Sequence, residues 1–402
     1  MITRRLLLTS VGLAASGIAR AQGTGKPFKI GVMADQNGIY SDVTGRGTVE
    51  AARLAVEDAG GAVFGRPVQV LVGDDQNKAD VSSGLACRWI DEDGVEAIVV
   101  GGGSGPAMAV LAVAKEKNTT VLMSGPGSSD ITGPLCATVS THWAFDTYGL
   151  SSTVGKAVVQ DGGRKWFFIT ADYSFGLALE RDATRVIKAG GGTVVGSVRH
   201  PVGTSDFSSY LLAARESGAD VVGLANAGSD LVNSIKQAQE FGLTRNGQRL
   251  AGLLLYVNDI QALGLEASRG TVGATSFYHD QTDATRAWTK RYDANFPGHI
   301  PNMVQAGAYA AVNHYLKAVK AIGTSEAIAV GKQMRATPVN DFYNHDIRIR
   351  TDGRVLQDMM LWHAKTPAES KGKTDLLALT QTVPGSEVYR PETEGGCPLV
   401  RS

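Results

Sequence analysis

Short runs that are apolar throughout alternate with longer amphipathic stretches from Phe28 onward. The run FKIGVMA at 28–34 predicts a strand, and TVEAARLAVEDAGG at 48–61 places valines and alanines at helical spacing before two glycines. Continued along the chain, the alternation predicts strands at 67–75, 95–102 and 119–125, and helices at 82–94 and from Pro106. Strands that are apolar on both faces, with helices between them, predict a parallel sheet covered on both sides.

The alternation begins again near Gly162, which indicates a second unit of similar size. It predicts strands at 165–170, 193–198, 219–225 and 250–256, and helices at 175–190, 205–217 and 229–241. Farther on it predicts helices at 282–296 and 303–321, a β-hairpin within 346–364 that turns at Asp352-Gly353, and a polar tail from Lys365 with little periodicity. Because 402 residues are too many for one ordinary core, we expect an α/β protein with two doubly wound parallel-sheet domains.

The first residues have the pattern of an export signal rather than of a folded element. Arg4 and Arg5 precede an apolar run, and Ala19-Arg20-Ala21 has the small-residue spacing of a cleavage site. We therefore expect residues 1–21 to be a signal peptide and the mature protein to be periplasmic. The paired arginines leave the twin-arginine route open beside the general secretory one. The apolar run is well short of the ~20 residues that a membrane-spanning helix needs.

Composition and charge narrow the classes of partner. With 43% hydrophobic and 19% charged residues the chain is typical of a folded soluble protein, and 39 basic against 39 acidic residues give no sign of a nucleic-acid partner. None of the seven histidines pairs at metal-ligand spacing, and no phosphate-binding glycine motif is present, so we expect no metal and no cofactor. Three cysteines allow one disulfide in an oxidising compartment and leave one thiol over.

Two predicted strands end in loops rich in glycine and serine, Gly101–Gly105 and Ser124–Ser129. Ligands of parallel sheets bind beyond the carboxyl ends of the strands, which is where these loops lie. Aromatic residues follow other strands at the same edge: Tyr40, His142, Trp143, Tyr173, Tyr256, Phe277 and Tyr278. Each of them alone could cap a core. Together with the glycine loops they predict a small-molecule cleft with apolar walls and a few backbone donors.

Catalytic motifs are missing from the sequence. Ser104 stands in GGSGP, which does not match the G-x-S-x-G pattern of a nucleophile elbow. Asp172 and Asp259 follow predicted strands, but two carboxylates so far apart in sequence do not indicate acid–base chemistry. We therefore expect no catalytic residues and no enzymatic activity.

The leader and four long segments resemble the leucine/isoleucine/valine-binding family, type I periplasmic binding proteins that feed ABC importers. The segments are FKIGVMADQNGIYSDVTGRGTVEAARLAVEDAGG, GRPVQVLVGDDQNKAD, GGGSGPAMAVLAVAKEKNTTVLMSGPGSSDIT and DFSSYLLAARESGADVVGLANAGSDLVNSIKQAQEFGL. The resemblance runs from about Phe28 to His363. It implies two lobes joined by three crossing hinge segments, one lobe of 27–142 plus 279–355 and the other of 143–278 plus 356–402. It also implies a small-molecule ligand, permease subunits of an ABC transporter as partners, and a monomer.

The resemblance implies a set of ligand contacts as well. In the family, two glycine–serine loops hold the ligand carboxylate with hydroxyls and with backbone N–H groups at helix N-termini, where an anion is favoured. On this sequence those loops carry Ser104, Gly105, Gly125, Gly127 and Ser128. The remaining expected contacts come from the strand-end aromatics and the second lobe: Tyr40, His142, Trp143, Tyr173, Asn226, Tyr256 and Asp259.

Three departures from the family's amino-acid binders bear on the ligand. Gly127 stands where a threonine is usual, the nearest acid to Tyr256–Asn258 is Asp259, and the second-lobe loop reads NAGSD where aromatic residues are common. The stretches STHWAFDTYGL and YVNDIQALG resemble a branch that includes binders of aromatic and other organic acids. We therefore expect an aromatic or related organic acid without an amino group. There are three alternatives: a binder of a branched-chain amino acid, amide or urea; a periplasmic ligand sensor; and a hydrolase, which no motif supports.

The resemblance also bears on the cysteines. Cys87 lies on a predicted helix where the family's amino-acid binders carry one partner of a disulfide, but Gly103 occupies the second position here. We therefore expect Cys87 to be a free, buried thiol. We expect Cys136 to pair with Cys397 and so to tie the tail to the first domain.

Overall fold

Six strands from the first part of the chain form one sheet in the computed structural model, which describes residues 25–243 and 247–400. In sheet order they are β2 (Ala62–Val63), β3 (Arg66–Asp74), β1 (Phe28–Ala34), β4 (Val95–Val100), β5 (Thr120–Met123) and β6 (Ser140–His142). All neighbours pair in parallel except β2 and β3. Successive side chains of β1 enter different cores, Val32 on one face and Met33 on the other, as a strand buried on both sides requires.

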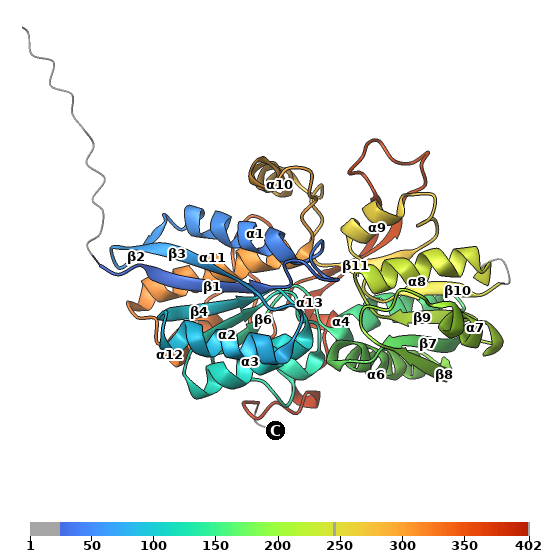
Figure 1. Ribbon diagram of the computed structural model, residues 1–402, viewed down its shortest axis with the longest axis horizontal. Coiled ribbons are helices and arrows are strands. Elements are labelled where there is room, and N and C mark those ends of the chain that lie inside the picture. Colours follow the sequence, from blue (N-terminus) through green and yellow to red (C-terminus); the bar gives the residue numbers. More distant parts are fainter. Residues whose placement is uncertain (1–24, 244–246, 401–402) are drawn as a thin grey trace, which may run out of the picture.

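Helices cover both faces of this sheet and complete the first lobe (Figure 1). They are α1 (Gly45–Asp58), α2 (Ala79–Asp91), α3 (Ser104–Glu116), α11 (Met303–Ile322) and α12 (Ala327–Ala336), with the 3-10 turn η1 (Ser129–Thr132) after β5. α10 (Asp283–Asn295) contacts α1 and stands apart from the sheet (Figure 1). α1 packs against α11 on one face, and α2 packs against α3 on the other. Gly31 in β1 is required by this packing, because a Cβ there would lie 2.4 Å from the Trp89 ring of α2. Helix α12 was not predicted from the sequence.

The second lobe is built around a four-stranded parallel sheet. Its order is β10 (Arg249–Gly252), β9 (Val221–Ala225), β7 (Lys165–Ala171) and β8 (Thr193–His200). Its helices are α4 (Thr147–Leu150), α5 (Lys156–Gln160), α6 (Ser174–Ala189), α7 (Ser208–Glu216), α8 (Ser229–Glu240) and α9 (Val257–Leu263), with a π-helical turn, η2 (Ser151–Gly155), between α4 and α5. Phe168 and Ile169 of β7 enter opposite cores, as in β1. The expected strand at 250–256 is shorter in the structure because the chain leaves the sheet after Gly252 and turns into α9.

A third, antiparallel sheet lies at the junction of the lobes and corrects the predicted hairpin. It consists of β11 (Val272–Thr275), β12 (Met359–Ala364) and β13 (Leu377–Val383) in that order. The chain does turn at Gly353, whose φ is +90°, but only one bridge, Ile349 to Val355, joins the two arms. The apolar run of β12 pairs instead with β11 and β13. Most residues of β13 are exposed, so this edge strand lacked the alternation that predicts a strand.

The chain crosses between the lobes after β6, after β11 and before β12. The first and third crossings lie side by side: His142 donates its backbone N–H to Gly353 O (2.9 Å), and Val355 donates to His142 O (3.1 Å). Between them the fully buried Arg354 donates to Phe145 O at 2.8 Å. The strands fall on the expected sides of the crossings, β1–β6 before residue 143 and β7–β11 within 143–278. The lobe boundaries themselves stay a prediction.

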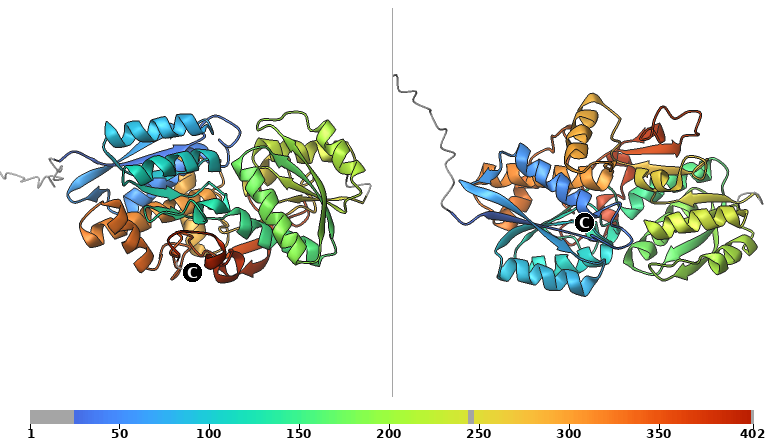
Figure 2. Two further views of the ribbon diagram at one scale, coloured as in Figure 1. Left: turned by 90° about the horizontal axis from the view of Figure 1, so that it is seen from below. Right: turned by 45° about the horizontal axis from the view of Figure 1, so that its top comes forward.

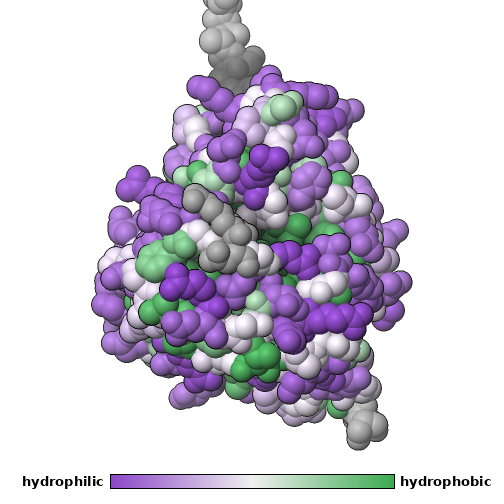
Figure 3. All heavy atoms as spheres, turned by 90° about the vertical axis from the view of Figure 1, so that its right-hand side faces the viewer, coloured by the Kyte–Doolittle hydropathy of each residue, from purple (hydrophilic) through white to green (hydrophobic). Residues whose placement is uncertain are grey.

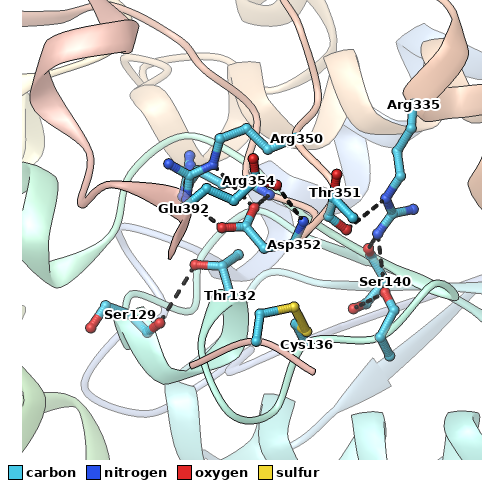
Figure 4. The surroundings of a disulfide bond; sticks show 12 residues. Ser129, Thr132, Cys136, Ser140, Arg335, Arg350, Thr351, Asp352, Arg354 and Glu392 are labelled. Carbon is cyan, nitrogen blue, oxygen red and sulfur yellow. Dashed lines mark hydrogen bonds and ion pairs between the residues drawn. A yellow bond between two sulfur atoms is a disulfide. The ribbon is translucent and has the colours of Figure 1, made fainter. Parts of the chain in front are cut away.

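A disulfide joins Cys136 to Cys397, with 5.6 Å between the Cα atoms (Figure 4). The C-terminal segment that it anchors includes α13 (Gly385–Val388) and a 3-10 turn, η4 (Glu392–Glu394), and lies beside the junction of the two lobes (Figure 2). Its Val388 carbonyl accepts from Ser152 Oγ of the second lobe at 2.5 Å. Cys87 is free but only half-buried, so the expectation of a fully buried thiol is corrected: α2 leaves one side of it toward solvent.

The outer face of the second lobe is mostly hydrophilic, with hydrophobic residues in small separate groups (Figure 3). Among residues 25–243 and 247–400, no helix has the length and apolar character to cross a membrane. The predicted signal peptide and its arginines lie outside the described residues.

Candidate functional site

The carboxyl ends of strands from both lobes face a small cavity of about 20 Å³. Its first-lobe wall comes from the loops after β1, β4 and β5, and its second-lobe wall from those after β7, β9 and β10. The lining residues are Tyr40, Val43, Thr44, Gly102, Gly103, Ser104, Gly125, Gly127, Tyr173, Phe175, Ala227, Leu254 and Tyr256. A larger hollow of about 570 Å³ lies beside β10, but its walls come from the second lobe and the third sheet. The cavity between the lobes is therefore the candidate site.

The glycines of the first-lobe wall are required by protein packing. A Cβ on Gly125 would lie 1.8 Å from Gly101 O, so the loops after β4 and β5 touch through bare backbone. A Cβ on Gly127 would lie 2.7 Å from Phe175 and 2.8 Å from Phe145. The small residues thus let the loops approach each other and let aromatic rings reach the cavity, which was not the reason expected from the sequence.

Ser104, the first residue of α3, organises this wall. Its buried hydroxyl oxygen accepts from the backbone N–H groups of Gly127 (3.1 Å) and Ser128 (3.0 Å). Those two N–H groups, which we expected to hold a ligand carboxylate, are therefore bonded to Ser104. A hydroxyl that accepts two bonds still has one proton to donate, and Ser104 lines the cavity.

Two tyrosines from different lobes meet at the cavity. The Tyr40 and Tyr173 hydroxyls form a hydrogen bond to each other. Beside them Ser229 N, in the second lobe, donates to Ile39 O, in the first, at 3.3 Å. Burial raises the pKa of both tyrosines, so both stay protonated at neutral pH. The lobes are thus in contact over the cavity.

Aromatic rings and uncharged polar groups make up the remaining surface of the cavity. Tyr256, the residue before α9, has its ring centroid 6.2 Å from that of Phe145. Thr44 Oγ1 donates to Tyr40 O at 3.0 Å, within its own turn. None of the described residues that line the cavity has a charged side chain. The groups left to contact a ligand are hydroxyls and aromatic or aliphatic surface.

The structure brings six of the twelve expected contacts into the lining: Tyr40, Ser104, Gly125, Gly127, Tyr173 and Tyr256. His142 and Trp143 lie elsewhere. His142 Nε2 is 2.6 Å from Pro126 O, and burial, together with the charge of Arg354, holds the pKa of this histidine well below its usual value. Trp143 is fully buried and donates Nε1–H to Thr141 Oγ1 at 2.8 Å. Both side chains are fully buried in the interior near the crossings.

Four further expected contacts also lie outside the lining. Asp259 accepts from Tyr256 N at 2.8 Å and caps α9, and burial raises the pKa of this carboxyl to about 7. Ser128 Oγ accepts from Asp130 N at 3.3 Å and caps η1. Asn226 donates Nδ2–H to His200 Nε2 at 3.2 Å. Gly105 is on the first turn of α3, facing Ser174 of α6. Local capping explains two of these four departures.

Seven lining residues were missed by the sequence analysis: Val43, Thr44, Gly102, Gly103, Phe175, Ala227 and Leu254. Gly102 and Gly103 are in the glycine loop already singled out, and Phe175 is two residues from Tyr173, so extending each expected contact to its loop would have found these three. Val43 and Leu254 look like ordinary core residues in the sequence. In the described part of the chain, no three His, Cys, Asp or Glu side chains are grouped as metal ligands.

Two α/β lobes that meet over one cavity define a solute-binding protein of the two-lobed, hinged class. The chain belongs to the periplasmic binding protein family, whose model matches residues 27–373. This confirms the family, the type I fold and the absence of enzymatic activity, since members of the family bind ligands without transforming them. It also rules out the hydrolase alternative.

Individual relatives agree with this assignment. A periplasmic binding protein from Burkholderia mallei is 42% identical, and the likeness covers 94% of this chain and 100% of that one with a TM-score of 0.91. A branched chain amino acid ABC transporter periplasmic ligand-binding protein from Burkholderia xenovorans LB400 is 35% identical over 92% and 99% of the two chains, with a TM-score of 0.82. The Leu/Ile/Val-binding protein homolog 6 of Brucella melitensis is 24% identical over 80% of this chain and 82% of its own.

Proposed function

We propose that this periplasmic solute-binding protein captures a small organic acid without an amino group, preferably an aromatic one, and presents it to the permease of an ABC transporter. The observation that carries the proposal is the lining of the cavity, where aromatic rings and hydroxyls occur without a charged side chain. Such a surface suits a ligand that is largely apolar and has one group able to accept hydrogen bonds.

The carboxylate end has donors available. Ser104 keeps one O–H, Tyr256 brings another hydroxyl, and the Tyr40–Tyr173 pair leaves one proton free, because one of its two hydroxyls donates to the other. Hydrogen bonds from neutral donors can hold a carboxylate without an ion pair, as they do at helix N-termini. The cavity is also small, so a compact acid is favoured.

No residue that lines the cavity has a carboxylate that could pair with the ammonium group of an amino acid. Asp259, the acid that would favour an amino acid if it faced the cavity, is turned to the backbone N–H of Tyr256. Burying an ammonium group without a partner is costly. The fold itself accepts aromatic acids: an ABC transporter solute-binding protein from R. palustris with a TM-score of 0.78 and 20% identity is a complex with benzoate.

The Burkholderia xenovorans relative supports a branched-chain amino acid as the second candidate, because its name assigns it to amino-acid transport and it is 35% identical. We propose in addition that the protein is a monomer. A role in sensing instead of transport would leave the cavity chemistry unchanged.

A thermal-shift screen with benzoate, leucine and 4-methylpentanoate, the acid that leucine becomes without its amino group, tests the proposal. A ligand at ~100 times its Kd adds ~2.7 kcal/mol to the free energy of unfolding. We expect benzoate or 4-methylpentanoate to stabilise the protein and leucine to have a smaller effect. Stabilisation by leucine alone would contradict the proposal and favour the amino acid.

A serine variant tests the site itself. Ser104→Ala removes one hydroxyl donor and should weaken binding of the acid found in the screen about 10- to 150-fold, the range for a hydrogen bond to a charged group. Ser83→Ala, on α2 and remote from the cavity, is the matched control and should bind as the wild type does. Equal affinities of both variants, measured by calorimetry, would place the carboxylate elsewhere.

A further inference from the structure

A buried carboxylate beside the cavity has an oxygen without a partner. Asp230, in the first turn of α8, is 1% exposed. Its Oδ2 accepts from Gly203 N at 3.0 Å, while its Oδ1 has no hydrogen-bond partner among the described residues. Leaving such an oxygen unpaired is costly, so a partner is expected when the protein is at work.

The sheet order places this carboxylate at the ligand edge. Asp230 follows β9 and its partner Gly203 follows β8, while β7 lies between those two strands. The bond from Gly203 to Asp230 therefore spans the carboxyl end of β7, where Tyr173 begins α6. The turn that carries Asp230 touches Tyr40: a Cβ on Gly228 would lie 2.9 Å from the Tyr40 ring, and Ser229 N donates to Ile39 O at 3.3 Å.

Asn226 provides a second unpaired oxygen at the same place. It is fully buried at the end of β9, and its Nδ2 donates to His200 Nε2 while its Oδ1 has no partner in the described chain. His200 cannot supply the missing proton, because its other nitrogen, Nδ1, is 2.8 Å from Pro201 O. The two oxygens, Asp230 Oδ1 and Asn226 Oδ1, are called the acceptor pair below. They flank Ala227, which lines the cavity.

We propose that the acceptor pair determines specificity by accepting a hydrogen bond from a donor group that the ligand carries in addition to its carboxylate. Both atoms can only accept, so they select a donor and disfavour an unsubstituted ring. The inference rests on the proposed function for the carboxylate end of the ligand. In an aromatic acid the donor is a ring hydroxyl. In an amino acid the ammonium group would donate the same hydrogen bond.

Asp230→Asn is the decisive variant. The Gly203 N–H needs an acceptor, so the amide oxygen takes the place of Oδ2 and the NH₂ group takes the place of Oδ1. The free acceptor thereby becomes a donor with almost no change in shape. Asp172→Asn is the matched control, since Asp172 is exposed and stands next to Tyr173 at the end of β7.

The readout is a ratio of affinities within matched pairs, measured by calorimetry. The pairs are each hydroxybenzoate isomer against benzoate, and leucine against 4-methylpentanoate. We expect the wild type and Asp172→Asn to prefer the donor-bearing member of one pair about 10- to 150-fold, and Asp230→Asn to lose that preference. The affinity for benzoate or 4-methylpentanoate should stay unchanged, which a general loss of structure would not produce.

The outcomes separate this inference from the proposed function. The inference is overturned if the wild type has no preference in either pair, or if its preference survives Asp230→Asn. Binding of benzoate would uphold the proposed function in either case. Preference for leucine that depends on Asp230 upholds the inference and overturns the aromatic-acid proposal. If no compound of the panel binds, both are overturned. Should Asp230→Asn fail to fold, Asn226→Ala removes the second acceptor, and the same ratio of affinities can be measured with that variant.

Discussion

At the scale of single residues, the candidate site is shaped by close packing of small side chains. Gly125 lies against Gly101 O, and Gly127 lies under the rings of Phe145 and Phe175. Ser104 closes the wall by accepting from two backbone N–H groups. The small residues of this wall therefore have two effects: they let two loops touch, and they leave room for a ligand.

Gly127→Val is expected to weaken ligand binding by at least tenfold. A Cβ at this position would lie 2.7 Å from the Phe175 ring of the second lobe, so the larger side chain should hold the lobes apart. Calorimetry with the acid found in the screen measures the effect. Gly84→Val is the control, because no atom lies within 4 Å of a Cβ there. Unchanged affinity of Gly127→Val would show that the lobes close without this contact.

At the scale of elements, caps at helix N-termini use several side chains that the sequence offered as ligand contacts. Asp259 caps α9 and Ser128 caps η1. Aspartate and serine are preferred at these positions for the same reason that they bind ligands, since their oxygens accept from backbone N–H groups. The residue type alone therefore could not distinguish a helix cap from a ligand contact.

The cap of α9 has a predicted signature in the pH dependence of stability. Burial raises the pKa of Asp259 to about 7, so the folded protein holds this proton more tightly than the unfolded chain does. The resulting stabilisation is complete below the unfolded pKa, near 4, and is lost as the pH rises toward 7. Asp259→Asn keeps an acceptor for Tyr256 N but cannot ionise. We expect this variant to gain stability relative to the wild type between pH 5 and pH 8.

Urea unfolding at both pH values measures the difference. Asp206→Asn is the control: hydrogen bonds from Ser208 lower the pKa of this exposed carboxyl, so its contribution is constant between pH 5 and 8. A wild-type and an Asp259→Asn protein that respond equally to pH would contradict the raised pKa.

At the scale of the whole molecule, contacts far apart in sequence hold the two lobes together. Ser129 Oγ of η1 donates to Asp182 of α6 at 2.6 Å, and Arg181 forms an ion pair with Asp130 at 2.9 Å. The C-terminal segment adds bonds to both lobes, through Arg390 to Ser129 O (3.1 Å) and through Glu394 to Arg185. The segment thus acts as a strap across the junction, and the disulfide fixes its end.

Cys397→Ser is expected to lower the free energy of unfolding by ~2–5 kcal/mol, because the disulfide joins residues 261 apart and its loss frees the strap. Unfolding in urea, with both proteins purified under oxidising conditions, gives the difference. Cys87→Ser is the matched control, since Cys87 is free in the structure. The same midpoint for Cys397→Ser and the wild type would show that the strap contributes nothing to stability.

Most of the fold could be read from the sequence, whereas only half of the expected site contacts could. The central strands of both parallel sheets are buried on both faces, so their period and order are visible locally. β13 and α12 were missed because an exposed edge strand and a short helix carry weak patterns. Of the expected contacts, those at the tips of strand-end loops line the cavity, such as Tyr40 and Tyr173.

The sequence by itself determined the class of fold, the two-lobed organisation, the family and the edge at which the ligand site lies, because each of these depends on local periodicity or on a resemblance spread over the chain. The tertiary structure alone decided which strand-end side chains face the cavity. Asp259 turns to its own helix, His142 and Trp143 enter the interior, and Asp230 is bonded to Gly203 of the loop after β8. These outcomes depend on which backbone N–H groups lie nearby after folding, and no periodicity in the sequence records that.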